Sequence, residues 1–111
     1  MKLSRFSGNL AEDKAASFLE SRGFLILERN FYAKKLGEID IIASKDNTIH
    51  FVEVKSGITF EPIYNITKSK LRHVINSAEY YLKFKNLKNA FSIDALIVKN
   101  DDIELIENIT L

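Results

Sequence analysis

The sequence has no cysteine, and its positive and negative charges nearly cancel. The absence of cysteine excludes disulfide bonds, thiolate metal sites and cysteine nucleophiles. The 16 Lys and Arg residues against 15 Asp and Glu residues give a net charge of +1, so the chain is not a polycation. A nucleic-acid surface would therefore have to come from the distribution of the basic residues.

Long apolar runs are absent as well. No stretch approaches the roughly 18 consecutive apolar residues of a membrane span, and no apolar signal core follows residues 1–6. We therefore expect a cytoplasmic protein that does not enter a membrane. The length of 111 residues predicts a single domain, residues 1–111, and 46% apolar with 28% charged residues is a globular composition.

Two short apolar runs, residues 37–43 and 49–55, predict a β-hairpin. β-Branched and aromatic residues dominate both runs, and acidic residues recur at every second position. A turn of two residues (46–47) or of four (45–48) gives the same register, in which side chains alternate between two faces. The expected pairs are Ala43 with His50, Asp40 with Glu53, and Glu38 with Lys55.

This register sets the carboxylates of Asp40 and Glu53 side by side. Directly opposed residues have Cβ atoms roughly 4.5–5.5 Å apart, and like charges at that distance destabilise a hairpin. Mg²⁺ takes oxygen ligands, usually with one or two carboxylates from the protein, so the pair predicts a metal site. The alternative is a half-exposed hairpin with solvated acids and a Glu38–Lys55 ion pair. Against it, both faces carry apolar residues and should be covered; these are Ile39, Ile41, Val52 and Val54 on one face and Ile42 and Phe51 on the acidic face.

An amphipathic helix is predicted before the hairpin, over residues 10–22, with Asn9 as its N-cap and Gly23 as its stop. Its apolar stripe places the carboxylate of Glu12 along a buried edge. Helix physics alone favours a capping box, in which Glu12 binds the backbone of Asn9. An apolar first strand follows over residues 24–32, and then a loop with Lys34 and Lys35, which are either solvated or attract phosphate.

The second half begins with an irregular stretch, residues 56–65, in which Phe60 and Tyr64 either stack on bases or pack on their own domain. A second amphipathic helix follows, capped by Asn65 or Thr67. Basic residues outnumber acids along it, and those at its start are the candidates for phosphate contacts; they are Lys68, Lys70 and Arg72.

Two further strands complete the predicted order, over residues 91–98 and 103–106. Asp94 interrupts the first of them, and we expect an Arg or Lys partner for this carboxylate and a structural or dimer role. His50 and His73 have no partner at a metal-binding spacing and receive no role. The order is helix, three strands, helix, two strands, which predicts an α/β sandwich around a mixed sheet.

The pattern of Asp40, twelve residues, then Glu53-Val54-Lys55 resembles the core of the PD-(D/E)xK nucleases, with Ile39 in place of the proline. Across nearly the whole chain the sequence also resembles the YraN family of bacterial endonuclease-like proteins. The residues that carry this resemblance are Gly8, Ala11, Glu12, Ala15, Phe18, Leu19, Gly23, Phe24, Ile26, Leu27, Asn30, residues 37–40 and 51–55, Ile66, Lys68, Ile93 and Asp94.

The resemblance implies a restriction-endonuclease-like αβββαββ fold, similar to archaeal Holliday-junction resolvases. It implies DNA as the partner, a glutamate from the first helix (Glu12) beside the metal site, and a homodimer, since those resolvases cut two strands with two sites. One departure is Gly57, where such proteins commonly carry an arginine that would contact phosphate.

The expected function is that of a metal-dependent endonuclease acting on DNA, including branched or otherwise structured DNA. Asp40 and Glu53 would hold Mg²⁺ or Mn²⁺ with the Val54 carbonyl, and Lys55 would orient water or stabilise the transition state. Glu38 would lie on the same face next to the metal ligands, without binding the metal itself. The alternative is a module that keeps the nuclease fold but only binds nucleic acid or protein, which small size, near-neutral charge and Gly57 favour.

Overall fold

The structure, a computed structural model, describes residues 3–56, 67–100 and 102–110, with side chains from Leu10 onward. Phe60, Tyr64, Gly57 and Asn65 lie outside the described residues, together with the interpretations that rest on them. The elements are α1 (Leu3–Ser21), β1 (Leu25–Tyr32), the short 3₁₀ helix η1 (Lys34–Leu36), β2 (Glu38–Lys45), β3 (Thr48–Ser56), α2 (Lys68–Phe84), β4 (Ala90–Lys99) and β5 (Asp102–Ile106).

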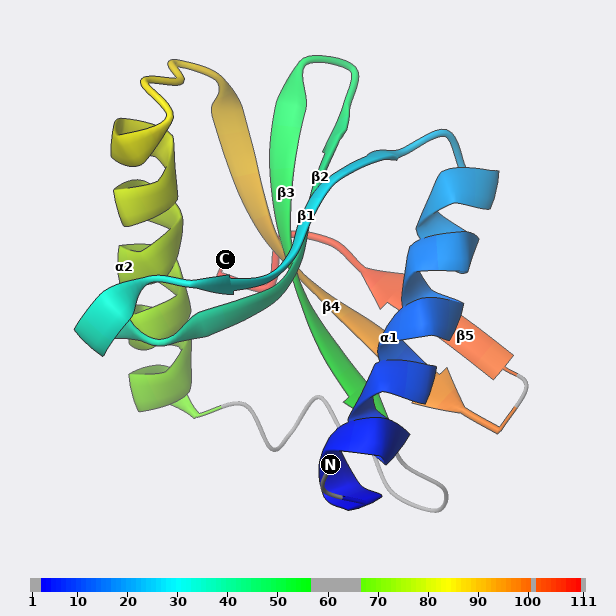
Figure 1. Ribbon diagram of the computed structural model, residues 1–111. Helices are drawn as coiled ribbons and strands as arrows, with labels where there is room; N and C mark the ends of the chain where they lie inside the picture. The colour runs from blue at the N-terminus through cyan, green and yellow to red at the C-terminus, as the bar shows by residue number, and fades with distance from the viewer. Residues whose placement is uncertain (1–2, 57–66, 101, 111) are drawn as a thin grey trace.

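Within the described residues, five strands form one sheet in the order β1-β2-β3-β4-β5. Strands β3 and β4 are parallel and the other neighbours are antiparallel. The helices α1 and α2 lie on opposite faces of this sheet (Figure 1). The predicted order of elements and the mixed sheet are therefore confirmed, with η1 as an addition.

Each helix covers its own apolar cluster. The two clusters together take up the apolar residues of the central strands, and burying one large side chain contributes about 1.5–3 kcal/mol. The α1 cluster contains Ala15, Leu19, Phe24, Ile41, Ala43, Val52 and Leu96, and the α2 cluster contains Ile39, Ile42, Phe51, Val74, Ala78, Tyr81 and Ile93.

The predicted hairpin is present as β2 and β3. Its turn residues Asp46 and Asn47 both have positive φ, of 50° and 66°, which is the conformation of a two-residue type I′ turn. The register pairs Ala43 with His50, as predicted, but the ladder ends at Ile41 with Val52. The predicted pairs of Asp40 with Glu53 and of Glu38 with Lys55 are therefore not part of the ladder.

The face of Ile39 was predicted wrongly. Ile39 packs in the α2 cluster, whereas Ile41, two residues further on, packs in the α1 cluster. The same change occurs in the neighbouring strand, where Asn30 has a φ of 54°. Arg29 pairs with Ile41 and Phe31 with Ile39 on either side of it. The left-handed Asn30 breaks the alternation of side chains in β1, and β2, which pairs with it, changes faces at the same point.

The first helix begins at Leu3 and not at residue 10. Asn9 consequently lies inside the helix, and the capping box between Asn9 and Glu12 is wrong because an N-cap stands at the first turn. The other end is as predicted. Gly23 has a φ of 90° and donates to the Glu20 carbonyl at 3.1 Å, which closes the helix with a left-handed glycine.

The second helix begins as predicted. The side chain of Thr67 accepts a hydrogen bond from the backbone N–H of Lys70 at 3.1 Å, so Thr67 is the N-cap of α2. Neither helix in the described part of the chain is long and apolar enough to cross a membrane.

Candidate functional site

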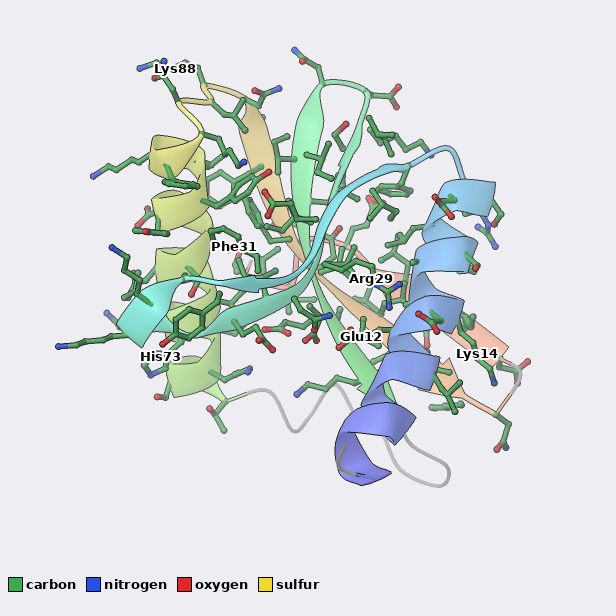
Figure 2. All side chains as sticks on the ribbon, viewed as in Figure 1. Glu12, Lys14, Arg29, Phe31, His73 and Lys88 are labelled. Carbon is green, nitrogen blue, oxygen red and sulfur yellow. The ribbon has the colours of Figure 1, made fainter. Side chains whose placement is uncertain are left out.

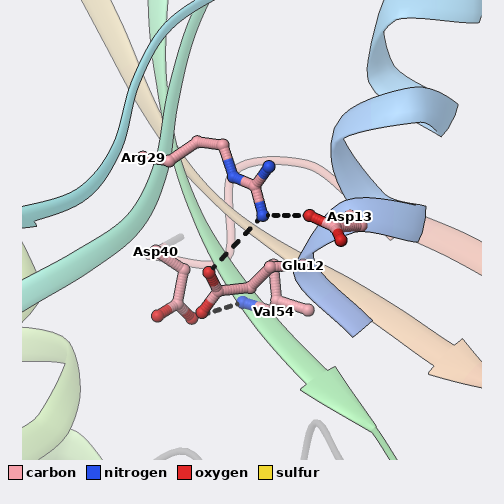
Figure 3. A network of polar contacts seen from close by, with 5 residues as sticks. All are labelled: Glu12, Asp13, Arg29, Asp40 and Val54. Carbon is pink, nitrogen blue, oxygen red and sulfur yellow. Dashed lines mark hydrogen bonds and ion pairs between the residues drawn. The ribbon is translucent and has the colours of Figure 1, made fainter. Parts of the chain in front are cut away.

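The site lies where β2 and β3 separate. The ladder between these strands pairs residues from Lys45 with Thr48 up to Ile41 with Val52. Beyond that point a side chain replaces the backbone acceptor: the Oδ2 of Asp40 accepts a hydrogen bond from the backbone N–H of Val54 at 2.8 Å (Figure 3). The bond fixes the Asp40 carboxylate at the fork of the two strands.

Glu53 stands beside Asp40 and is almost completely buried, with a relative exposure of 3%. Its Oε1 has no hydrogen-bond partner within the described residues, and the Nζ of Lys70 lies 3.8 Å from it. Burial and the negative charge of Asp40 raise the pKa of Glu53 to about 8, while the positive charges of Lys70 and Lys55 lower it. A carboxylate held in this way favours a cation next to it.

Glu12 reaches the same fork from the other face of the sheet. Figure 2 shows it between α1 and the sheet, directed toward Arg29, and Figure 3 shows its carboxylate next to that of Asp40. Arg29 lies 3.9 Å from Glu12 and binds Asp13 at 2.6 Å. Burial raises the pKa of Glu12, hydrogen bonding to Asn30 lowers it, and the charge of Asp40 raises it.

Helices on opposite faces therefore contribute to one site. Glu12 comes from α1, and Lys70 comes from the first turn of α2. The two meet Asp40 and Glu53 because the strands part there instead of continuing as a closed ladder. The carboxyl groups of the site also influence one another, since the charges of Asp40 and Glu38 both raise the pKa of Glu12.

The remaining residues predicted at the motif take varied positions. Lys55 is partly exposed on β3, and Val54 packs against the α1 cluster. Glu38 is exposed and pairs with Tyr32 in the β1–β2 ladder. Both Glu38 and Lys55 belong to the described part of the chain, and they form no ion pair there, which argues against the alternative of a simple Glu38–Lys55 bridge.

Of the predicted basic residues, the structure brings Lys70 to the carboxylates. Lys68 and Arg72 instead line a groove along α2 with Leu71, Ile75, Asn76 and Glu79. Lys34 and Lys35 are exposed on η1, at the tip of the β1–β2 pair beside α2 (Figure 1).

Arg29 is a residue of the site that the sequence did not single out. It lies in an apolar strand and has an acidic pair, Glu12 and Asp13, opposite it on α1. The signal was a charged residue within an apolar run, but its partner depends on which face it takes, and that face follows from the register shift between Ile26 and Glu28.

The prediction of an Arg or Lys partner for Asp94 was wrong, and so was the prediction that His50 has no role, because the two residues pair with each other. The Nδ1 of His50 lies 2.6 Å from Asp94 Oδ2, and the hydroxyl of Ser92 and the backbone N–H of Asn108 donate to Asp94 Oδ1. Asp94 is completely buried, so this network satisfies a carboxylate that would otherwise be costly. It is a structural network between β3 and β4, where Asp94 pairs with Val52.

The donor set at the fork fits a hard divalent cation. In residues 3–56, 67–100 and 102–110 no three His, Cys, Asp or Glu side chains are arranged to hold a metal ion. The predicted ligands include two carboxylates, those of Asp40 and Glu53, and Mg²⁺ usually takes one or two carboxylates from a protein. The Val54 carbonyl would add a third oxygen ligand. The observation that fits a cation is the buried Oε1 of Glu12 and of Glu53, neither of which has a hydrogen-bond partner in the part of the chain that the structure describes.

Comparison with known proteins gives the family. The model of the uncharacterised protein family UPF0102 matches residues 11–98. A UPF0102 protein of Sulfurovum sp. is 56% identical over 111 residues, covering 99% of this chain and 98% of the relative. A UPF0102 protein of Helicobacter hepaticus is 57% identical over 108 residues, covering 97% of each chain. UPF0102 protein WS0451 of Wolinella succinogenes is 56% identical over 109 residues, covering 98% of this chain and 100% of the relative. The chain belongs to the UPF0102 family, the YraN-like family that its signature residues predicted.

Proposed function

We propose that this protein is a metal-dependent endonuclease that hydrolyses phosphodiester bonds in DNA, including branched or otherwise structured DNA. The observation that carries the proposal is the fork, where the Asp40 carboxylate accepts a hydrogen bond from Val54 and the buried Glu53 has an oxygen without a hydrogen-bond partner among the described residues. The proposal includes a restriction-endonuclease-like fold, a cytoplasmic location and a homodimer with two sites.

In this proposal Asp40, Glu53 and the Val54 carbonyl hold Mg²⁺ or Mn²⁺. When bound, the cation supplies a water of lowered pKa and neutralises charge on the scissile phosphate. Lys55, on the same strand as Glu53, orients the attacking water or stabilises the negative charge that develops on the phosphate. Glu12 faces Asp40 at the fork and Arg29 holds it there, so Glu12 adds a third carboxylate beside the reacting phosphate.

DNA would be held by the positive charges near the fork. Lys70 and the first turn of α2 are the nearest, and Lys68, Arg72, Lys34 and Lys35 extend the basic surface. Phosphate contacts of this kind position a duplex without reading its sequence, so structure and not sequence would select the substrate.

The test is a cleavage assay with branched, nicked, single-stranded and linear DNA and with RNA, in Mg²⁺, Mn²⁺ or EDTA. Asp40→Asn and Lys55→Ala should each lower the rate by about 10²–10³-fold or more. Asp46→Asn is the matched control, because it removes the same charge at the distant hairpin turn.

Cleavage that needs metal, survives in Asp46→Asn and is lost in Asp40→Asn would support the proposal. If the wild type cuts no substrate in either metal but binds DNA, the module that only binds is the better description. The net charge of +1 is the observation that favours this second function.

A further inference from the structure

Lys70 is placed against a buried carboxylate without forming a hydrogen bond to it. Its Nζ lies 3.8 Å from Glu53 Oε1, and that oxygen has no hydrogen-bond partner within the described residues. The side chain of Glu53 is 4% exposed, whereas that of Lys70 is 46% exposed. The ammonium group therefore lies on the solvent side of Glu53 and is free to move away from it.

The position of Lys70 is not explained by its helix. The positive end of a helix dipole favours acidic residues, but the first turn of α2 has none and carries Lys68 and Lys70. Lys68 and Arg72 line the groove along α2, and Lys70 is the residue of this group that contacts Glu53. Lys70 therefore interacts with the fork, through Glu53, and not with a residue of its own helix.

We propose, on the basis of the proposed function, that Lys70 is a tethered cation that competes with the divalent cation for Glu53. A divalent cation bound at Asp40 and Glu53 repels the ammonium group, and the long flexible stem of lysine lets it swing outward. The released ammonium group then binds a backbone phosphate beside the N–H groups at the start of α2.

This exchange couples the two ligands. Cation binding frees Lys70 for phosphate, and phosphate binding removes the competitor from Glu53, so each ligand raises the affinity for the other by the same factor. Lys70 is a positioning residue in this scheme. Its removal should strengthen cation binding in the absence of DNA and weaken the coupling between cation and DNA.

The first measurement is Mg²⁺ binding by isothermal titration calorimetry without DNA. Lys70→Gln should bind Mg²⁺ at least about threefold more tightly than the wild type, because a half-exposed ion pair is removed. Lys68→Gln is the matched control, with the same charge change on the same turn, and it should bind Mg²⁺ like the wild type. Circular dichroism checks that both variants fold.

The second measurement is the affinity for a short DNA duplex, followed by fluorescence anisotropy with and without Ca²⁺, which shares the preference for oxygen ligands. The factor by which Ca²⁺ strengthens DNA binding should be about threefold or more smaller in Lys70→Gln than in Lys68→Gln. This comparison separates coupling from the general loss of one positive charge, which both variants share.

The outcomes separate this inference from the proposed function. If Lys70→Gln binds Mg²⁺ no more tightly than Lys68→Gln, the competition is refuted and the nuclease proposal stands. If no form binds Mg²⁺, both are refuted. If Lys70→Gln binds Mg²⁺ more tightly and loses the coupling while the wild type cuts nothing, the inference on Lys70 holds and the nuclease proposal fails.

Discussion

Replacing Glu53 by Gln should stabilise the metal-free protein at neutral pH. The substitution keeps the shape of the side chain and removes its charge. Glu53 has an ordinary pKa of 4.5 when unfolded and one of about 8 in the folded protein, where it is 3% exposed. The folded state therefore binds a proton that the unfolded state releases, and folding at neutral pH includes the uptake of this proton.

The size of the effect follows from the two pKa values. Because the folded pKa is raised, the stability contributed by Glu53 is fully present below pH 4.5 and is lost as the pH rises to about 8. One pKa unit is worth about 1.4 kcal/mol. Between about pH 5 and pH 8 the free energy of unfolding of the wild type should fall by about 3 kcal/mol relative to that of Glu53→Gln.

The assay is urea unfolding followed by circular dichroism over this pH range in EDTA. Glu20→Gln, an exposed position on α1, is the control and should keep the pH profile of the wild type. A difference between wild type and Glu53→Gln that is constant across the range would refute the reasoning. In a second arm, Mg²⁺ at about 100 times its Kd should stabilise the wild type by about 2.7 kcal/mol, and Glu53→Gln much less.

Three further predictions concern the surrounding structure. Asp94→Ala should lower the free energy of unfolding by about 3 kcal/mol, since it leaves His50 without its buried partner, while Mg²⁺ binding by calorimetry stays as in the wild type. Thr67→Ala should cost about 1 kcal/mol in urea unfolding through the loss of the α2 cap. Arg29→Gln should cost only about 0.2–1 kcal/mol, because its side chain is 35% exposed, and an NMR titration should show the pKa of Glu12 rising further.

The parts of the site that the sequence predicted are those set by local structure. The hairpin register follows from a two-residue turn, Asp46-Asn47, between two runs of period two, and both signals lie within the hairpin itself. For that reason the sequence alone predicts that Asp40 and Glu53 lie close together. The environment of Glu12 needed the family resemblance, because helix geometry alone favoured a cap at Asn9.

The predictions that were wrong depend on contacts between residues far apart in the sequence or on a rare backbone conformation. The changed face of Ile39 accompanies the positive φ of Asn30, and a single asparagine inside a strand gives no reliable sign of such a conformation. The pair of His50 and Asp94 joins residues 44 positions apart. It requires the parallel register of β3 and β4, in which His50 pairs with Ser92, and a parallel pair has no connecting turn that could reveal its register in the sequence.

The parallel pairing of β3 and β4 also has a consequence for how the molecule folds. The type I′ hairpin can close within microseconds, since its contacts are local, and it brings Asp40 and Glu53 together while both are still in water. The parallel strand must wait for the long crossover through α2, which makes it the slower step. Glu53 is buried in that step, so the refolding rate of the metal-free chain should fall with rising pH while the speed of hairpin closure does not.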